Sequence, residues 1–246
     1  MSSLIGKRAF VTGGSRGIGA AIARRLAAEG ADVAIAYEQS AAAAQVIVEE
    51  LQQAGRLAVA IQMDAASPDS IREAVDRAAA ELGGLDILVN NAGIMRAGPP
   101  ETMSLKDIDD TLAVNIRAVL LASQAALAYL PSGGRIISIG SNLAEQVPTA
   151  GLSLYSMSKA ALIGWTKGLA RDLGPRGITV NVVHPGSTET DMNPVDGPTA
   201  EGQLSRMAIK AYGRAEDVAA LVAFVAGDEA RSINGSGLTI DGGANA

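Results

Sequence analysis

Residues 8–19 read Arg-Ala-Phe-Val-Thr-Gly-Gly-Ser-Arg-Gly-Ile-Gly, a short apolar run that leads directly into a glycine cluster. The apolar run predicts a buried strand, and Ala20 to Glu29 continue as a stretch of helical length. Glycines between a strand and a helix permit a tight turn and let backbone N–H groups approach an anion at the positive end of the helix. The spacing differs from G-x-G-x-x-G, so this stretch alone leaves open a glycine cluster that serves only as a turn.

The same alternation of apolar run and helical stretch recurs outward from this segment. Strands are predicted at Arg8 to Val11, Asp32 to Tyr37, Leu57 to Gln62, Asp86 to Asn90, Arg135 to Gly140, Thr179 to Val183 and Leu238 to Ile240. Helices are predicted at Ala20 to Glu29, Ala41 to Ala54, Ser70 to Leu82, Leu105 to Leu130, Tyr155 to Asp172 and Glu216 to Ala226. The alternation predicts an α/β fold: a doubly wound Rossmann domain with a seven-stranded parallel sheet flanked by helices on both faces. Ligands of such sheets bind outside the carboxyl ends of the strands.

The composition limits the domain count and the kinds of partner. With 246 residues the chain is expected to form one domain, residues 1–246. Hydrophobic residues make up 48% and aromatic residues 3%, so Ala, Leu, Ile and Val must fill the core. The net charge is −6 and no Lys/Arg cluster is present, which argues against nucleic acid and anionic membrane as partners.

Cysteine is absent, which excludes a disulfide framework, a thiolate nucleophile and a Cys-based metal site. Met1 to Lys7 lack the apolar core of a secretory signal, and no apolar run approaches the roughly 18 residues of a membrane span. We therefore expect a cytoplasmic location. The one histidine, His184, makes no triad and no His-rich metal site, so we interpret it as structural and expect no bound metal.

One segment breaks the alternation, from Pro185 to about Tyr212, with three prolines and several polar residues. It is predicted to be a loop with a short helix. Long irregular loops in compact domains usually have a function, so we expect residues 187–212 to cover a substrate. An ordinary surface excursion is the alternative.

Several further motifs follow the predicted strands in order. Asn90-Asn91-Ala92-Gly93 ends the fourth strand, Asn115 lies within a long predicted helix, Ser141 closes the fifth strand, and Tyr155-x-x-x-Lys159 begins the next helix. Pro185-Gly186 follows the sixth strand and Asp241-Gly242-Gly243 lies near the end. Together with the glycine cluster these motifs resemble the short-chain dehydrogenase/reductase superfamily, in its branch of about 250 residues that includes 3-oxoacyl reductases and ketone reductases, and the resemblance covers essentially the whole chain.

The resemblance implies a nicotinamide dinucleotide cofactor. An acidic residue at the end of the second strand would bind the ribose hydroxyls of NAD, but Tyr37 stands there. Arg16 resembles the basic residue with which NADP-preferring members hold the 2′-phosphate, so NADP(H) is expected rather than NAD(H), with Glu38 an awkward neighbour for the phosphate. The cofactor set implied by resemblance is Gly13, Ser15, Arg16, Gly17, Ile18, Gly19, Tyr37, Asp64, Ala65, Asn91, Ala92, Gly93, Tyr155, Lys159, Pro185, Gly186, Thr188 and Thr190. Asp64 could instead begin a turn, and Thr190 could cap a helix.

The catalytic set implied by the resemblance is Asn115, Ser141, Tyr155 and Lys159. Tyr155 and Lys159 are four residues apart, so a helix places them on one face. Reduction of a carbonyl needs a hydride and a proton, and Tyr155 is the expected proton donor. A free phenol titrates near pH 10, and the cation of Lys159 is expected to lower that value. By resemblance Ser141 orients the substrate oxygen, and Asn115 holds a water that links Lys159 to solvent; a buried polar group bonded to neighbouring backbone is the alternative for Asn115.

The substrate is expected to be a neutral ketone of modest size, reduced to a secondary alcohol. Reductases that act on acyl carrier protein tend to carry basic residues near the end of the long central helix, and residues 128–134 carry none. The interval from Ser141 to Tyr155 is instead similar to that of fungal hydroxynaphthalene reductases. Residues 142–147, Gly151 and Leu152, and residues 188–207 are expected to line the pocket.

A second class of function stays open. Residues 174–179 and 191–194 resemble those of biofilm-dispersal proteins of the same fold that bind cyclic di-GMP, which suggests a cyclic-dinucleotide or NADP(H) sensor. The intact Ser141, Tyr155 and Lys159 set favours catalysis, although fold alone does not decide function. The resemblance also implies a homotetramer, built partly by the helices predicted at Leu105 to Leu130 and Tyr155 to Asp172; their Ala content equally suits burial within one chain.

Overall fold

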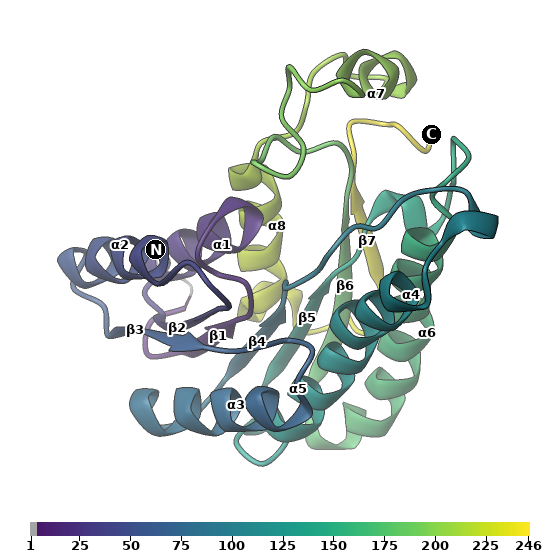
Figure 1. Ribbon diagram of the computed structural model, residues 1–246. Coiled ribbons are helices and arrows are strands. Elements are labelled where there is room, and N and C mark those ends of the chain that lie inside the picture. The colour runs from purple at the N-terminus through teal and green to yellow at the C-terminus, as the bar shows by residue number, and fades with distance from the viewer. Residues whose placement is uncertain (1–3) are drawn as a thin grey trace.

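A single parallel sheet organises residues 4–246, which are described by a computed structural model (Figure 1). Its strands are β1 (Arg8–Val11), β2 (Asp32–Tyr37), β3 (Ala58–Gln62), β4 (Ile87–Asn90), β5 (Arg135–Ile139), β6 (Thr179–Pro185) and β7 (Gly237–Ile240). They lie in the order β3-β2-β1-β4-β5-β6-β7. The winding direction therefore reverses between β1 and β4, which is where ligands of doubly wound sheets bind. The predicted fold class and all the predicted strands are confirmed, and β6 continues to Pro185.

Helices cover both faces of the sheet and bury its apolar strands. Their bounds are α1 (Gly17–Ala28), α2 (Ala41–Gln53), α3 (Pro68–Leu82), α4 (Leu105–Leu112), α5 (Ala118–Ala126), α6 (Ser153–Leu173), α7 (Ala200–Arg206) and α8 (Ala215–Ala226). Helices α1, α2 and α8 pack on one face, and α3, α5 and α6 on the other. Alanine is frequent in these contacts, so the helices approach the sheet closely, and few aromatic residues, among them the buried Phe10, take part. No helix within residues 4–246 is both long and apolar enough to cross a membrane.

The helix predicted over Leu105 to Leu130 is not one α-helix. It divides into α4 and α5 around a π-helical turn, Ala113–Arg117. Asn115 lies in that turn, where both polar atoms of its side chain bond the backbone of Ile94. A π-helical turn adds a residue to the helical repeat and is frequent at functional sites. The prediction missed it because the apolar pattern continues through the turn.

The segment that follows β6 contains the predicted short helix, α7. Figure 1 shows α7 beyond the carboxyl ends of the strands, away from the main body. Thr188 forms a β-bridge with Gly213, which joins the two ends of the segment. Met192 and Ile209 are exposed. The segment therefore stands above the expected ligand site with apolar side chains free to contact other groups.

Candidate active site

The glycine loop has the shape of an anion cradle. Gly13 has φ +64°, a conformation that favours glycine, and a Cβ on Gly19 would collide with the carbonyl oxygen of Gly13. Helix α1 begins at Gly17, and the residue before it, Arg16, makes no side-chain hydrogen bond to the first turn. The first N–H groups of a helix have no partner within the helix, so here they are left for a ligand. This arrangement fits a pyrophosphate.

The segment after β4 is tied to the glycine loop across the point where the winding reverses. The Asn91 side-chain amide donates to the carbonyl oxygens of Thr12 at 2.9 Å and Gly13 at 3.0 Å. In return the Thr12 hydroxyl accepts from the backbone N–H groups of Asn91 at 2.9 Å and Ala92 at 3.0 Å. Thr12 was not among the predicted site residues, although its place between β1 and the glycines was a signal for it.

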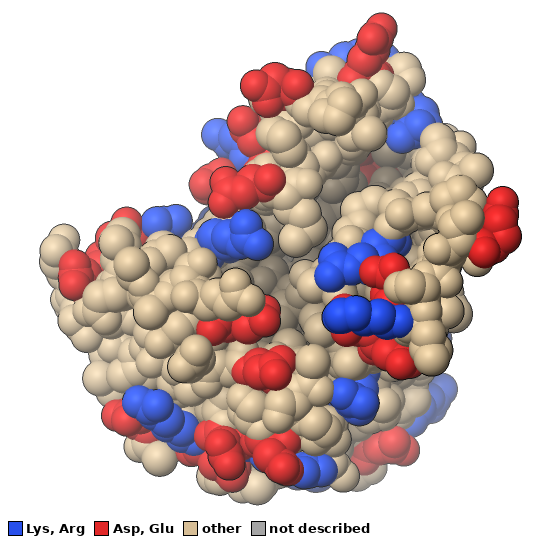
Figure 2. Space-filling model, viewed as in Figure 1, with Lys and Arg blue, Asp and Glu red and all other residues tan. Residues whose placement is uncertain are grey.

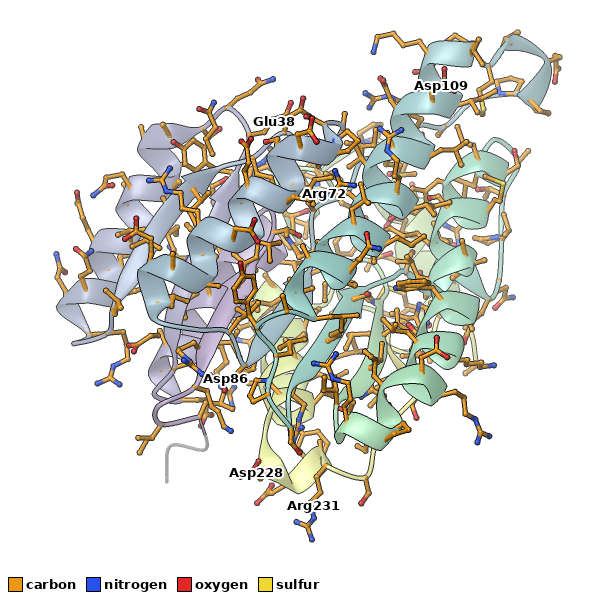
Figure 3. All side chains as sticks on the ribbon, turned by 90° about the horizontal axis from the view of Figure 1, so that it is seen from below. Glu38, Arg72, Asp86, Asp109, Asp228 and Arg231 are labelled. Carbon is orange, nitrogen blue, oxygen red and sulfur yellow. The ribbon has the colours of Figure 1, made fainter. Side chains whose placement is uncertain are left out.

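The residues expected to select the cofactor lie at the ends of β1 and β2. Tyr37 ends β2 and is half-buried, whereas Glu38 is exposed at the surface (Figure 3). The Arg16 side chain is 62% exposed, and its guanidinium lies 3.9 Å from the carboxylate of Asp191. Arg16 is thus free to meet a phosphate, but it already contacts an acidic residue of the segment after β6. The sequence held no signal for that contact.

The structure shows the local roles of Asp64 and Thr190. The Asp64 carboxylate accepts from the N–H of Ala66 at 2.7 Å, so Asp64 does begin a turn. Thr190 caps no helix, because it pairs with Asn193 and α7 begins only at Ala200. Its methyl group instead lies 3.4 Å from the place a Cβ would take on Gly17, which brings the segment after β6 against the glycine loop.

Tyr155 and Lys159 lie in the first turns of α6, beside the end of β5. The Lys159 ammonium is 5.9 Å from the centre of the Tyr155 ring and donates a hydrogen bond to the carbonyl of Ile139 at 2.9 Å. The Ser141 side chain lies near the Tyr155 hydroxyl, whose pKa it lowers, and the Ser141 hydroxyl accepts a hydrogen bond from the N–H of Leu143 at 3.2 Å. The structure therefore brings the predicted serine, tyrosine and lysine together.

Asn115 joins this cluster through a polar network. Its side chain accepts from the N–H of Ile94 and donates to the Ile94 carbonyl, both at 2.8 Å. It also donates to the Ser158 hydroxyl at 3.0 Å, and Ser158 donates to the Tyr155 carbonyl at 2.7 Å. A Cβ on Gly93 would lie 3.3 Å from Lys159 Nζ, so the segment after β4 closes over the cluster. Ser158 was not predicted, although it precedes the lysine within the motif.

Burial dominates the electrostatics of the cluster. It lowers the pKa of Lys159 to about 8, and among residues 4–246 no carboxylate pairs with this lysine. Burial also raises the pKa of Tyr155, against a smaller lowering by the Ser141 hydrogen bond. Burial thus outweighs the lowering of the Tyr155 pKa that the sequence predicts.

His184 lies directly beneath the serine. It is fully buried in β6, and its Nδ1 atom is 3.2 Å from the backbone nitrogen of Ser141 and 2.9 Å from its carbonyl oxygen. Burial lowers the pKa of His184, which favours the neutral ring. Its contacts are with backbone, as the structural interpretation of this residue expects.

An apolar hollow of about 420 Å³ lies between the loop after β5 and the start of α6, and none of Ser141, Tyr155 and Lys159 lines it. Its lining consists of Leu143, Ala144, Val147, Thr149, Ala150, Gly151, Leu152, Ser153, Ser156, Met157 and Ala160. The loop after β5 lines this hollow, and residues 188–207 do not. Figure 2 shows that the molecule is also hollowed beneath the segment that carries α7, with side chains of both charges on the rim.

A doubly wound sheet with a glycine loop at its winding reversal defines a dinucleotide-binding protein, and comparisons with known proteins identify its family. The family model of the short chain dehydrogenases matches residues 7–200. A short chain dehydrogenase from Burkholderia cenocepacia J2315, crystallised with NADP, is 70% identical with a TM-score of 0.98, over 99% of this chain and 100% of that one.

Two named relatives are more distant. The cyclic-di-GMP-binding biofilm dispersal mediator protein of Escherichia coli K12 is 45% identical over 98% of each chain. The 3-oxoacyl-[acyl-carrier-protein] reductase of Staphylococcus aureus is 38% identical over 96% of this chain and 97% of the relative. The chain therefore belongs to the short-chain dehydrogenase/reductase family, which is a family of oxidoreductases, as its motifs indicated.

Proposed function

We propose that the protein is an NADPH-dependent carbonyl reductase that converts a neutral ketone to a secondary alcohol. The observation that carries the proposal is the cluster of Ser141, Tyr155 and Lys159, with Asn115 joined to it through Ser158. A protein that only binds a ligand has no need of a buried phenol beside a hydroxyl and an amine. General acid catalysis by such a phenol contributes roughly 10²- to 10⁴-fold to a rate.

In this proposal the residues at the carboxyl ends of β1 and β4 hold the cofactor. The loop from Gly13 to Gly19 receives the pyrophosphate on free N–H groups of α1, Arg16 receives the 2′-phosphate, and Lys159 receives the nicotinamide ribose. Thr190 lies against the glycine loop, where it can close the site. The bound dinucleotide supplies a hydride to the carbonyl carbon.

The chain itself supplies the proton. Ser141 donates a hydrogen bond that fixes the carbonyl oxygen, and Tyr155 gives its phenolic proton to that oxygen as negative charge develops there. Movement of the Lys159 ammonium from the Ile139 carbonyl toward the ribose would bring its charge to bear on the phenolate that remains. Asn115, whose side chain is already bonded to Ile94 and Ser158, contributes by holding α6 and the segment after β4 together.

The loop after β5 supports a neutral substrate. Residues 142–147, which follow Ser141, carry no Lys or Arg, so a polyanionic ligand finds no counter-charge on this loop. A substrate on acyl carrier protein is a further option, given the relative from Staphylococcus aureus. Two basic groups lie near residues 128–134, and both are engaged by backbone: Arg176 donates to the carbonyls of Leu127 and Leu130, and the buried Arg135 donates to those of Gly133 and Gly134, which favours the free ketone.

The proposal is tested by measuring NADPH and NADH oxidation over a panel of ketones that includes monocyclic, bicyclic and short-chain 3-oxoacyl compounds. We expect turnover of at least one neutral ketone, with NADPH preferred. The matched control is Tyr155→Phe, which removes one hydroxyl and preserves the ring. Equal rates in the two proteins would contradict the assignment of the proton donor.

A cyclic-dinucleotide sensor is the second candidate, favoured by the 45% identity to the biofilm dispersal mediator protein. Calorimetric titration with cyclic di-GMP separates it from the reductase. Tight binding together with no turnover on any ketone would favour the sensor, whereas turnover without binding would favour the reductase.

The proposal includes a homotetramer in the cytoplasm, as the family resemblance implies. Leu112 of α4 and Met157 of α6 are exposed apolar side chains on the helices expected to meet a neighbouring subunit. Sedimentation of the purified protein tests the assembly, and a monomer would contradict it.

A further inference from the structure

The motif Asp241-Gly242-Gly243 follows β7, and the proposed reaction gives it no role. β7 ends beside the Pro185-Gly186 turn, where the N–H of Gly186 donates to the carbonyl of Ile240 at 3.0 Å. A Cβ on Gly186 would lie 2.5 Å from the Cβ of Asp241. The two motifs that were distant in the sequence are therefore in contact, at the same end of the sheet as the proton donor.

Two glycines then turn the chain back toward β5. Gly242 has φ +63° and Gly243 has φ +76°, conformations that side chains disfavour. The Asp241 carboxylate holds the turn by accepting from the N–H groups of Gly243 at 2.9 Å and Asn245 at 3.1 Å. As a result, the side chain of Asn245 is directed toward the loop after β5.

Asn245 forms a hydrogen bond to Asn142, the residue that follows Ser141. Its amide donates to the backbone carbonyl of Asn142 at 2.8 Å, and the Asn142 amide lies 3.5 Å from acceptor oxygens of both Asn245 and Asp241. Asn142 is buried and begins the short helical turn that Ser141 caps. A shift of Asn142 would therefore move the Ser141 hydroxyl directly.

We propose that Asn245, oriented by Asp241, is a positioning residue that holds the Ser141 loop in place for the reaction, a role that rests on the reductase function proposed above. Asn245 touches neither Tyr155 nor Lys159 among its hydrogen bonds. It acts through the backbone of Asn142, whereas His184 contacts the backbone of Ser141 from within the sheet. The loop that carries the serine thus has hydrogen bonds both to β6 and to the segment after β7.

The experiment compares the wild type with Asn245→Ala and with a matched control, Asn234→Ala. Asn234 also bonds backbone from a position close to β7, accepting from the Val180 N–H at 2.9 Å and donating to the Ala170 carbonyl at 3.3 Å. These contacts lie near the amino end of β6, away from the proton donor. For each protein we would measure kcat and KM on a substrate ketone, the dissociation constant of NADPH, and amide hydrogen exchange.

We expect Asn245→Ala to lower kcat about tenfold, since small misplacements of catalytic groups cost one to two orders of magnitude. NADPH affinity should stay within twofold, and the amides of residues 143–146 should exchange faster than in the wild type. Asn234→Ala should change neither kcat nor exchange in that loop. If kcat and exchange are both unaffected in Asn245→Ala, or if only one of them changes, the positioning role is wrong.

The exchange measurement also separates this proposal from the reductase function. If the wild type reduces no ketone, the proposed function fails. The rate of amide exchange in residues 143–146 then tests by itself whether Asn245 keeps the Ser141 loop in place. Faster exchange in Asn245→Ala than in Asn234→Ala would support it, and equal exchange would overturn it.

Discussion

At the amino ends of the strands Arg8 meets the Asp86 carboxylate at 2.7 Å, whereas at the carboxyl ends the buried Lys159 donates, within residues 4–246, only to the carbonyl of Ile139. Figure 3 shows Asp86, Asp228 and Arg231 at one end of the molecule and Glu38 and Asp109 toward the other. The Asp86 contact raises the pKa of Arg8, while burial lowers that of Lys159. Paired charges stabilise the amino end, and an unpaired buried charge marks the end where chemistry is proposed.

Arg135 is a second buried cation, and it lies at the amino end of the sheet. It is buried at the start of β5, and burial lowers its pKa as it does that of Lys159. Its guanidinium donates to the carbonyls of Gly133, Gly134 and Gly227 and lies 3.6 Å from Asp228. A buried cation at the amino end thus has several acceptors around its two Nη atoms, although its Nε has none within residues 4–246. Over the same residues Lys159 has one acceptor, the carbonyl of Ile139.

The largest expected effect is at the carboxyl end. Tyr155→Phe should reduce kcat by about 10²- to 10⁴-fold, because it removes the proposed proton donor. NADPH affinity and thermal stability should be nearly unchanged, since the ring stays in place. Steady-state rates and a fluorescence titration with NADPH check both parts, and retained turnover would remove Tyr155 from the mechanism.

A second effect should appear in the pH dependence of stability. Lys159 releases its proton at about pH 8 in the folded protein, against 10.5 for an unperturbed lysine. Between these values the unfolded chain binds more protons, so stability rises with pH. The free energy of unfolding of the wild type, minus that of Lys159→Met, should increase by about 3 kcal/mol from pH 8 to 10.5. Urea unfolding at several pH values measures this difference, and a flat profile would show that Lys159 is not held as a buried base.

At the amino end we expect an effect on stability alone. Asp86→Ala removes the acceptor of the Arg8 backbone N–H at 3.0 Å and of its guanidinium at 2.7 Å. The loss should cost about 2 kcal/mol of unfolding free energy, because hydrogen bonds to charged groups contribute roughly that amount. Turnover at 25 °C should stay within about twofold of the wild-type rate. A large fall in kcat without unfolding would show that the amino end of the sheet affects catalysis as well as stability.

The smallest expected effect concerns Arg16. Arg16→Ala should weaken NADPH binding about tenfold, the loss of one exposed charge-assisted contact, and leave NADH binding unchanged. Titrations with both cofactors measure the ratio. An equal loss for NADH would mean that Arg16 acts on the shape of the glycine loop and not on the 2′-phosphate.

The sequence predicted what depends on local pattern. Alternating apolar runs and helical stretches were enough for the seven strands and the covering helices, and the order of motifs placed Ser141, Tyr155 and Lys159 at one end of the sheet. Contacts that arise only on folding had no such signal. Asp191 reaches Arg16 and Asn245 reaches Asn142 across long separations in the chain. The π-helical turn at Asn115 was missed because the amphipathic pattern continues through it.

The bond from Asn91 to Thr12 joins residues 79 positions apart, so the two walls of the cofactor site come from distant parts of the chain. Bringing these residues together carries the entropic cost of closing a long loop, which the packing of the intervening elements must offset. A chain that has folded only its first strands and helices has half a site and gains nothing from the dinucleotide. The cofactor is thus a ligand of the complete fold, and its concentration in the cell contributes to the thermal stability of the protein by mass action.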